Sequence, residues 1–412
     1  MKTIAVIISI DTKEAEARFL KNYIQNSGNK ALVIDISTRG AYDFISDISK
    51  EQVCRAGGGS PEILARQPKN EAVQTMIDGA KALLPALYAE GKIDAVISAG
   101  GLQNTFVAVG AMQTLPLGIP KVMVSTVLCG ERRFEQFTGI KDIVMIPSIV
   151  DVSGMNAISE TILSNAVAAV IGMVEHAGKA LRNDGKNRIG ATLMGVTNNS
   201  VVQAAAILEK EGLEIVCFHS TGVGGRYLEN LINDGVITAA MDISLHEITS
   251  ADVFNRGFSA GAPNRLRVGA EKGIPMLVAP GALDFIDLYV DDFFSGAIGD
   301  HRKRKFNLHN NKLAHIKLFP EEAKLAAEIV VERLNAAKGP VTCLLPLRGF
   351  RSDTLPGESL YDPEVDAVII DILNKNLKRE IKKVKIDANI NSMEFSRVAA
   401  AEMLELLRHK EA

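Results

Sequence analysis

The stretch IAVIISIDTKEAEARFLKNYIQNSG, from Ile4 to Gly28, contains the unit from which the fold is built. Its first part, Ile4 to Ile10, is a continuous apolar run, which is typical of a strand covered on both faces, as in a parallel sheet. The part that follows has the spacing of an amphipathic helix and ends at a glycine suited to a helix C-terminus. The stretch therefore predicts a strand followed by a crossover helix.

The same alternation recurs along the chain, where Val/Ile-rich runs are separated by helical patterns. The predicted strands are residues 4–10, 31–37, 94–101, 121–127 and 143–148, then 188–196, 214–220, 237–244, 275–281 and 341–349. A β-α-β-α order of this kind predicts the α/β fold class. We expect two Rossmann-like domains, each a largely parallel sheet with helices on both faces.

Length and one polar stretch divide the chain. Its 412 residues exceed the roughly 250–300 residues that one core serves. The segment Gly178 to Arg188 is rich in Lys, Arg, Asn and Gly, as linkers are. We expect domains at 1–180 and 188–412, with the final helix, capped by Ser392, free to pack back on the first domain.

Charge and composition argue against several classes of protein. A net charge of −3, from 46 basic and 49 acidic residues, provides no footprint for nucleic acid, and the basic run His301 to Lys305 is interpreted as a solvated loop rather than a polyanion site. The start of the chain does not have the pattern of a signal peptide. The longest uncharged apolar stretch, Thr161 to Val174, is shorter than the ~20 residues that span a bilayer, so no membrane association is expected.

Four widely spaced cysteines favour a reducing compartment and argue against a zinc site. Two of them, Cys217 and Cys343, lie in apolar strand-like runs and are expected to be buried. A cytoplasmic location follows as the prediction.

Polar residues and glycines follow the carboxyl ends of the strands predicted in the first half of the chain. Open α/β sheets bind their ligands beyond these strand ends. A lysine near a helix start and a Gly-Gly turn can hold a phosphate, although helix capping is the competing interpretation. The candidate ligand contacts are Asp11, Thr12, Lys13, Gly100, Gly101, Thr105, Ser125 and Thr126.

The second half of the chain has more candidate functional residues, above all in the segment Cys217 to Arg226, where a turn with three glycines joins a predicted strand to a predicted helix. A glycine-rich turn at a helix start is a cradle for an anion, and arginines can clamp a phosphate or carboxylate. The candidate ligand contacts are Thr221, Gly222, Gly224, Gly225, Arg226, Gly261 and Arg265. The candidate acid–base groups are His219, Glu247 and Asp284, and no spacing among these residues defines a metal site.

Several segments together resemble the Tm-one-like ATP-binding family, named for the amino-terminal part of the tomato mosaic virus resistance protein. They are IDTKEAE, PKVMVSTV, DVSGMN, FHSTGVGGRYLE, SAGAPNRL and GIPMLVAPGALD, and their order holds over nearly the whole chain. The resemblance implies two Rossmann-like domains that form a homodimer. It also implies an ATP site in the first domain, where Mg²⁺ could accompany the nucleotide. The residues that would contact ATP are Asp11, Thr12, Lys13, Gly100, Gly101, Thr105, Ser125 and Thr126.

One turn departs from the family's usual glycine-serine pattern. Leu102, Gln103 and Asn104 stand where small residues are usual, and their Cβ atoms are expected to crowd a phosphate lying against the backbone.

Two functions and one structural interpretation follow. The first is a nucleotide-binding protein with its ligand at the strand ends and the inter-domain cleft. The second is an enzyme that acts on a small phosphorylated or carboxylated metabolite through His219, Glu247 and Asp284, with Arg226 and Arg265 as anion anchors. In the third, the motifs only build turns.

Overall fold

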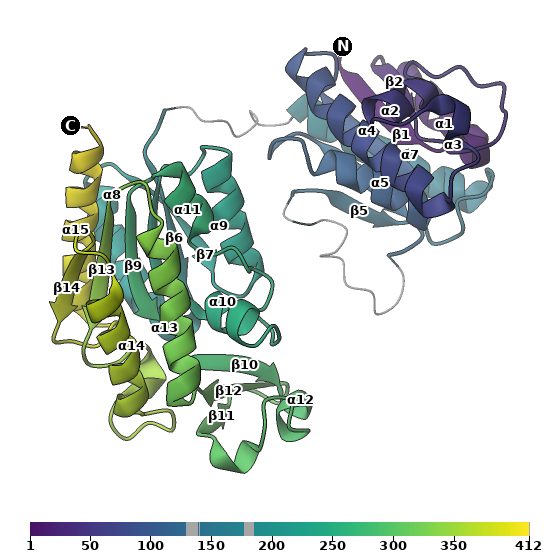
Figure 1. The fold of residues 1–412 in the computed structure, drawn as a ribbon. Coiled ribbons are helices and arrows are strands. Elements are labelled where there is room, and N and C mark those ends of the chain that lie inside the picture. The colour runs from purple at the N-terminus through teal and green to yellow at the C-terminus, as the bar shows by residue number, and fades with distance from the viewer. Residues whose placement is uncertain (129–138, 140, 177–184, 412) are drawn as a thin grey trace. The chain divides into compact units, whose positions relative to one another are not determined.

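The computed structural model describes residues 1–128, 139, 141–176 and 185–411 (Figure 1). It opens with β1 (Thr3–Ile8) and α1 (Ile10–Asn26), the predicted strand and crossover helix. The strand ends two residues earlier than predicted, because the Ser9 amide leaves the ladder and donates to Oδ1 of Asn104 at 2.9 Å. Contacts divide the chain into two units, Met1–Leu181 and Arg182–Ala412, called here the N-terminal and C-terminal units. Most of the predicted linker lies outside the described residues.

The N-terminal unit continues with β2 (Lys30–Asp35), α2 (Lys50–Ala56), α3 (Pro61–Leu64), α4 (Lys69–Ala89), β3 (Ala95–Gly100), α5 (Leu102–Met112), β4 (Lys121–Ser125), β5 (Val144–Pro147) and α7 (Ala157–His176). Its strands form one parallel sheet in the order β2-β1-β3-β4-β5. From β1 the chain adds β2 on one side and then β3, β4 and β5 on the other, so the topological switch point lies between β1 and β3.

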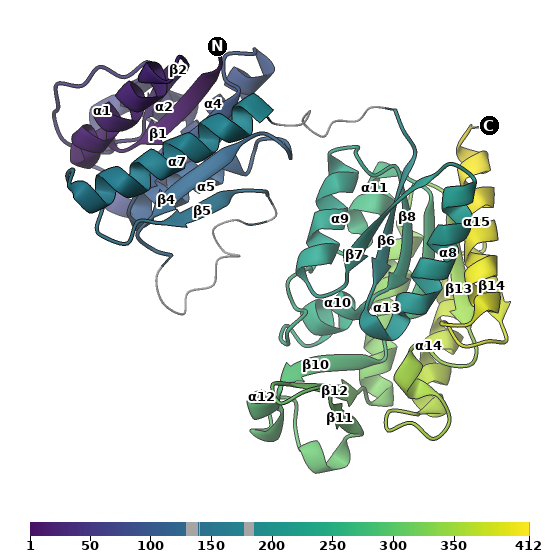
Figure 2. The same ribbon diagram turned by 180° about the vertical axis from the view of Figure 1, so that it is seen from behind.

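Helices cover both faces of this sheet, and β1 shows why (Figure 2). Ile4, Val6 and Ile8 pack under α1 and α7, whereas Ala5 and Ile7 pack under α2, α4 and α5. Successive strand residues point to opposite faces, so a strand buried twice must be apolar throughout. Each fully buried aliphatic side chain contributes about 1.5–3 kcal/mol.

α7 is longer than the apolar stretch measured in the sequence. The helix has 20 residues and contains an 18-residue stretch with a mean hydropathy of 1.6, enough by length and composition alone to cross a membrane, and it is the one such helix among the described residues. A core helix passes the same test, and α7 packs Leu163, Val167 and Val170 against β3 and β4. About a third of this apolar stretch is buried, so packing accounts for part of its composition.

The C-terminal unit has a second parallel sheet and a small insertion. Its elements are β6 (Arg188–Leu193), α8 (Asn198–Lys210), β7 (Glu214–His219), α9 (Val223–Asn233), β8 (Ala239–Ser244), α10 (His246–Ile248), α11 (Arg267–Lys272), β9 (Met276–Gly281), β10 (Phe285–Tyr289), α12 (Val290–Phe294), β11 (Phe306–Leu308), β12 (Leu313–Lys317), α13 (Pro320–Asn335), β13 (Val341–Pro346), α14 (Pro363–Asn376), β14 (Lys382–Ile386) and α15 (Met393–Glu411), with single turns at Gly195–Thr197, Thr249–Val253, His301–Lys303 and Ser352–Thr354.

The large sheet runs β14-β13-β9-β8-β6-β7 with all strands parallel, which confirms the predicted α/β class for both units. The sequence did not reveal β10-β12-β11, an antiparallel sheet inserted between β9 and β13. β10 pairs with β12 more than 20 residues further along the chain, and such pairing has no local signature, whereas β11 and β12 form a short hairpin.

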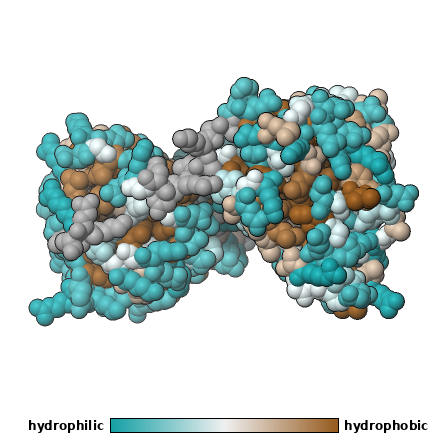
Figure 3. All heavy atoms as spheres, turned by 90° about the horizontal axis from the view of Figure 1, so that it is seen from above, coloured by the Kyte–Doolittle hydropathy of each residue, from teal (hydrophilic) through white to brown (hydrophobic). Residues whose placement is uncertain are grey.

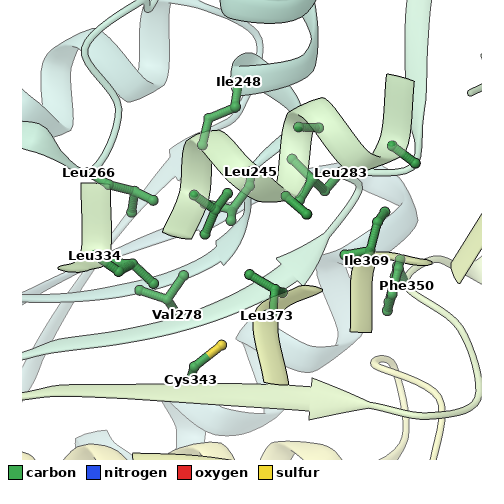
Figure 4. Packing of buried hydrophobic residues seen from close by; sticks show 14 of the residues in the cluster. Leu245, Ile248, Leu266, Val278, Leu283, Leu334, Cys343, Phe350, Ile369 and Leu373 are labelled. Carbon is green, nitrogen blue, oxygen red and sulfur yellow. The ribbon is translucent and has the colours of Figure 1, made fainter. Parts of the chain in front are cut away.

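The core of the C-terminal unit lies on both sides of the large sheet. α9, α11, α13 and α14 bury one face, where Val278 and Cys343 of the strands meet Leu334, Ile369 and Leu373 of the helices (Figure 4). α15 covers the other face beside α8. Cys217 is exposed, contrary to the prediction, because β7 is an edge strand.

Hydrophilic residues cover much of the molecular face in Figure 3, with smaller hydrophobic areas between them. The basic run at 301–305 is exposed at Arg302, Lys303 and Lys305, whereas Arg304 is buried. Arg302 pairs with Asp300, and Arg304 pairs with Glu322 at 2.6 Å. Much of the positive charge of the run is therefore compensated locally.

Candidate functional site

A cleft of about 470 Å³ lies in the N-terminal unit at the carboxyl ends of β1 and β3, and is called here the switch-point cleft. Loops after three strands and the start of α4 supply its walls. The lining residues are Ser9, Asp11, Thr12, Lys13, Thr38, Arg39, Lys69, Gly101, Leu102, Gln103 and Asn104. The location is the one at which open α/β sheets bind ligands, because the strand order reverses there.

The cleft has an excess of positive charge. Lys13, Arg39 and Lys69 line it together with one carboxylate, Asp11. Lys13 donates from Nζ to the Val152 carbonyl at 2.6 Å. Arg39 and Lys69 are exposed, so both remain accessible to a bound anion. Sequence reasoning found Lys13 but missed Arg39, which lies in a loop without a motif, and Lys69, which is the first residue of α4.

α5 begins at this cleft without a capping side chain. Its N-cap is Gly101, and no side chain accepts from the first turn. The free N–H groups of a helix start carry partial positive charge, which favours an anion. The cleft therefore combines a helix N-terminus with three cationic side chains.

Asn104 does not crowd the turn in the way that the sequence predicts. Its amide points inward, where Oδ1 accepts from the Ser9 amide and Nδ2 donates to Ser98 Oγ at 2.8 Å. It is almost fully buried and joins the ends of β1 and β3. A Cβ on Gly100 would lie 2.6 Å from Asn104 Cβ, so Gly100 is needed for packing.

Three other predicted contacts lie at the neighbouring strand end. Thr105 and Ser125 are fully buried and hydrogen-bonded to each other at 2.7 Å. The Thr126 amide donates to the Gly100 carbonyl at 3.2 Å. These three residues join β3 to β4 behind the cleft, where Thr105 Oγ1 donates to the Gly101 carbonyl at 2.9 Å. Asp11, Thr12, Lys13 and Gly101 line the cleft itself.

A buried acid at the end of β2 was not foreseen. Asp35 accepts hydrogen bonds from the Ser37 hydroxyl and from Tyr42, and burial raises its pKa. Ser37 Oγ in turn accepts from the Asp11 amide at 3.0 Å. Asp35 thereby holds the loop that carries Thr38 and Arg39.

The glycine-rich turn of the C-terminal unit already holds a carboxylate. Oε1 of Glu247 accepts from the Gly222 amide at 2.7 Å and from the Gly225 amide at 2.9 Å, and the side chain is fully buried. The turn has the anion-holding geometry that the sequence predicts, but its occupant comes from the same chain.

Close packing explains the glycines of this turn. Gly222 has φ +87°, in the left-handed region, and its Cβ would lie 2.7 Å from the Gly261 amide nitrogen. A Cβ on Gly225 would come within 2.0 Å of Glu247 Oε2, and one on Gly224 within 2.0 Å of the His219 carbonyl. Contacts within the protein therefore require these glycines. Thr221 lies half-buried in the same turn.

Arg265, predicted as an anion anchor, is fully buried among three carboxylates. Nη1 donates to Glu247 at 2.6 Å, Nη2 donates to Asp242, and Nε lies 3.6 Å from Glu229. Burial and the nearby Asp242 raise the pKa of Glu229 to about 7, although Arg265 opposes the shift. Arg265 thus neutralises internal acids, whereas Arg226 is exposed at the start of α9.

The three predicted acid–base groups are not assembled. His219 is exposed at the end of β7, and Glu247 is committed to the turn. Asp284 is fully buried, accepting from Lys317 at 2.6 Å and Arg351 at 3.0 Å. Burial by itself would raise the pKa of Asp284, but Arg351 and Lys317 hold it at about 2. A carboxylate so paired is a poor proton donor near neutral pH.

His246 forms a further buried cluster beyond β8. Its Nε2 lies 3.1 Å from Asp287, its ring stacks on Phe285, and Ser250 approaches the same nitrogen at 3.4 Å. In a nucleophilic triad the acid and the hydroxyl bind opposite ring nitrogens, which this arrangement lacks. Among the described residues no group of three or more His, Cys, Asp or Glu side chains is arranged to hold a metal ion.

Comparison with known proteins identifies relatives over the whole chain. The model described as "Uncharacterised protein family (UPF0261) N-terminal domain" matches residues 2–179, and that of the family's C-terminal domain matches residues 186–407. A UPF0261 protein of Clostridium tetani is 35% identical over 98% of this chain and 99% of its own length. The tomato protein "ToMV resistance protein Tm-1(GCR237)" is 32% identical over 96% of this chain, which spans 54% of that protein.

Solved structures give a weaker likeness. A UDP-GlcNAc 2-epimerase of Methanocaldococcus jannaschii is 11% identical over 99% of both chains, with a TM-score of 0.24. A UDP-N-acetylglucosamine 2-epimerase of Rickettsia bellii covers 99% of this chain and 96% of its own at 10% identity, with a TM-score of 0.22. Scores this low support no functional conclusion.

Proposed function

This chain belongs to the UPF0261 family, and from that premise we propose that its N-terminal unit binds a nucleotide, with ATP as the first candidate, in the switch-point cleft. The observation that carries the proposal is the convergence of Lys13, Arg39 and Lys69 with the uncapped start of α5. Phosphate groups bind where backbone N–H groups and cationic side chains face the same space. The resemblance to the Tm-one-like ATP-binding family supports the choice of ATP.

The dimensions of the cleft suit a small phosphorylated molecule. Ligand pockets commonly measure about 300–1,000 Å³, and the cleft has about 470 Å³. Leu102 is 51% exposed at its edge and offers an apolar contact to a base or sugar. Asp11 supplies a carboxylate near the cationic residues, as a phosphate-bound Mg²⁺ would require.

The residues that replace the usual small ones leave the phosphate position open in this proposal. Asn104 uses its side chain inside the sheet, and a Cβ on the neighbouring Gly101 would meet only Thr126 Oγ1, at 3.7 Å. The backbone of the α5 start is therefore accessible even though the side chains are larger than usual.

The decisive experiment is isothermal titration of the purified full-length protein with ATP, ADP, AMP and inorganic phosphate, each with and without Mg²⁺. We expect the nucleotides with more phosphates to bind more tightly. Lys69→Ala should weaken ATP binding about tenfold, because one contact between a cation and a phosphate is lost. Lys81→Ala, an exposed lysine on the same helix, serves as the matched control.

Arg39→Ala provides a second test from a different loop. It should weaken ATP binding by a similar factor without changing the melting temperature of the free protein, since its guanidinium makes one long hydrogen bond, to the Gln67 carbonyl at 3.4 Å. Unchanged ATP affinity in both variants would place the nucleotide elsewhere and overturn the proposal.

The alternative, an enzyme that uses His219, Glu247 and Asp284, has no comparable observation in its favour. Two of the three side chains are fully buried and already paired with cations or amides. We therefore retain nucleotide binding as the proposed function.

A further inference from the structure

A second cavity, of about 410 Å³, lies in the C-terminal unit where β13 ends and α14 begins, and is called here the β13 cavity. Its walls are mostly apolar. Leu347, Leu355 and Tyr361 line it while each keeps about two fifths of its surface exposed. Ala367 and Ile370 of α14 close one side. Solvent-exposed apolar side chains that line a cavity are typical of a ligand-binding site.

The cavity is rigidly built. Asn389 donates from Nδ2 to the carbonyls of Arg348, Gly349 and Arg351, which fixes the loop after β13. Arg351 is fully buried, stacks over Phe285 at 3.9 Å and pairs with Asp284. The hollow is therefore preformed, which lowers the cost of binding.

One carboxylate in the wall is incompletely neutralised. Asp366 accepts at Oδ1 from Lys317 Nζ at 2.7 Å, and the same Lys317 also serves Asp284. The network behind the wall contains two cations, Lys317 and Arg351, and three carboxylates, Asp284, Asp353 and Asp366. His315 Nδ1 lies 3.9 Å from Asp353, but burial lowers the pKa of His315, so its ring is not counted as a cation. It therefore has a surplus of one negative charge.

Asp366 is the carboxylate with the weakest compensation, because its one cation, Lys317, is shared with Asp284, whereas Asp284 also pairs with Arg351. Burial and the neighbouring Asp284 raise the pKa of Asp366, while Arg351 and Lys317 hold that of Asp284 low. Asp366 is the member of the network that lines the cavity, and its side chain keeps 13% of its surface exposed. A cation placed in the cavity would complete the pairing.

The other charged groups at the rim do not change this balance. Arg348 donates from Nε and Nη2 to Asp387, at 2.6 and 3.1 Å. Lys305 pairs with Asp362 at 2.8 Å. Arg348 and Lys305 are thus each paired with a carboxylate of their own. Asp366 is therefore the charged group that a ligand in the cavity would contact.

We propose that the β13 cavity binds a small organic amine, with its ammonium group at the Asp366 carboxylate and its apolar body against Leu347, Leu355 and Ile370. The class of ligand is a primary amine on a compact ring or short chain. This site is separate from the switch-point cleft and does not depend on nucleotide binding there.

The test uses three probes of one shape, benzylamine, benzyl alcohol and benzoate, titrated into full-length protein with ¹³C-labelled Ile and Leu methyl groups. We expect benzylamine to shift the methyl signals of Ile370 and Leu355 with a Kd of about 1 mM or lower. Benzyl alcohol and benzoate should bind at least about tenfold more weakly, because neither supplies a cation.

Variants separate the charge from the cavity. Asp366→Asn should reduce benzylamine binding to the level of benzyl alcohol, whereas Asp371→Asn, at an exposed position on the same helix, should leave it unchanged. Ala367→Trp should fill the cavity and abolish binding of all three probes. If Asp366→Asn does not fold, the probe series on the unmodified protein and Ala367→Trp still decide. Equal binding of benzyl alcohol, preference for benzoate, or no shift at Ile370 and Leu355 would each overturn the proposal.

Discussion

Replacing Glu247 with Gln tests whether the glycine-rich turn of the C-terminal unit depends on an internal anion. The side chain is fully buried and makes three hydrogen bonds, to Gly222, to Gly225 and, at 2.6 Å, to Arg265. The amide oxygen of Gln can still accept from the turn, but its NH₂ group then faces the Arg265 guanidinium, donor against donor. Breaking a buried ion pair costs about 3–5 kcal/mol, and Asp242 still partly neutralises Arg265, so we expect a loss of about 3 kcal/mol.

The assay is thermal unfolding of the full chain followed by far-ultraviolet circular dichroism, since the protein has no Trp. A loss of about 3 kcal/mol corresponds to a fall of roughly 6–12 °C in the transition of the C-terminal unit. Glu271→Gln, an exposed acid on α11, is the matched control. In Glu247→Ala, added formate should recover part of the lost stability relative to chloride at equal ionic strength. A melting temperature for Glu247→Gln within about 1 °C of the parent would refute the reasoning and reopen the turn to external anions.

Three further changes have expected outcomes. The folded pKa of Glu229, about 7, lies above its ordinary 4.5, so the stability it contributes is complete below pH 4.5 and is lost as the pH rises through 7. In Glu229→Gln the free energy of unfolding should fall less steeply as the pH rises, and denaturant unfolding at several pH values would measure this. An unchanged pH dependence would contradict the raised pKa of Glu229. Asn104→Ala should cost about 1–3 kcal/mol in denaturant unfolding, because buried polar partners lose their bonds, and a neutral effect would show that water replaces the amide. Gly225→Ala should lower the melting temperature by several degrees, because the new Cβ would overlap the Glu247 carboxylate. Gly172→Ala on α7 is the control, and it should raise the melting temperature slightly because the space around Gly172 is open. Equal changes in melting temperature would argue against the close contact at Gly225.

Much of the fold could be read from local patterns. The run from Ile4 became β1, and VTCLLPLRG became β13, because strands covered on both faces must be apolar at every position. The helix start at Ser392 was also visible, since the Phe395 amide donates to its hydroxyl. Strand ends were less predictable, because Asn104, about 95 residues away in sequence, takes the Ser9 amide out of the ladder.

The candidate site was only partly visible. Lys13 and Gly101 stood beside strand ends, where the sheet rule predicts ligand contacts, and both line the cleft. Arg39 stands in a loop and Lys69 at the start of α4, neither within a motif, so only the folded chain could bring them to the same place. The β13 cavity had no sequence signal, because Asp366 resembles any helix-surface acid until Lys317 and Asp284 are placed beside it.

The sequence by itself determined the α/β class, the two parallel sheets and the positions of the glycine-rich turns, since these depend on side-chain period and on glycine, which act locally. Only the tertiary structure decided what each turn holds. The turn at Gly222 and Gly225 closes on Glu247, which lies more than 20 residues further along the chain. The start of α5 opens on a cleft lined by lysine and arginine. Charge pairing acts through space, so two glycine-rich turns at strand ends acquire different surroundings once the chain has folded.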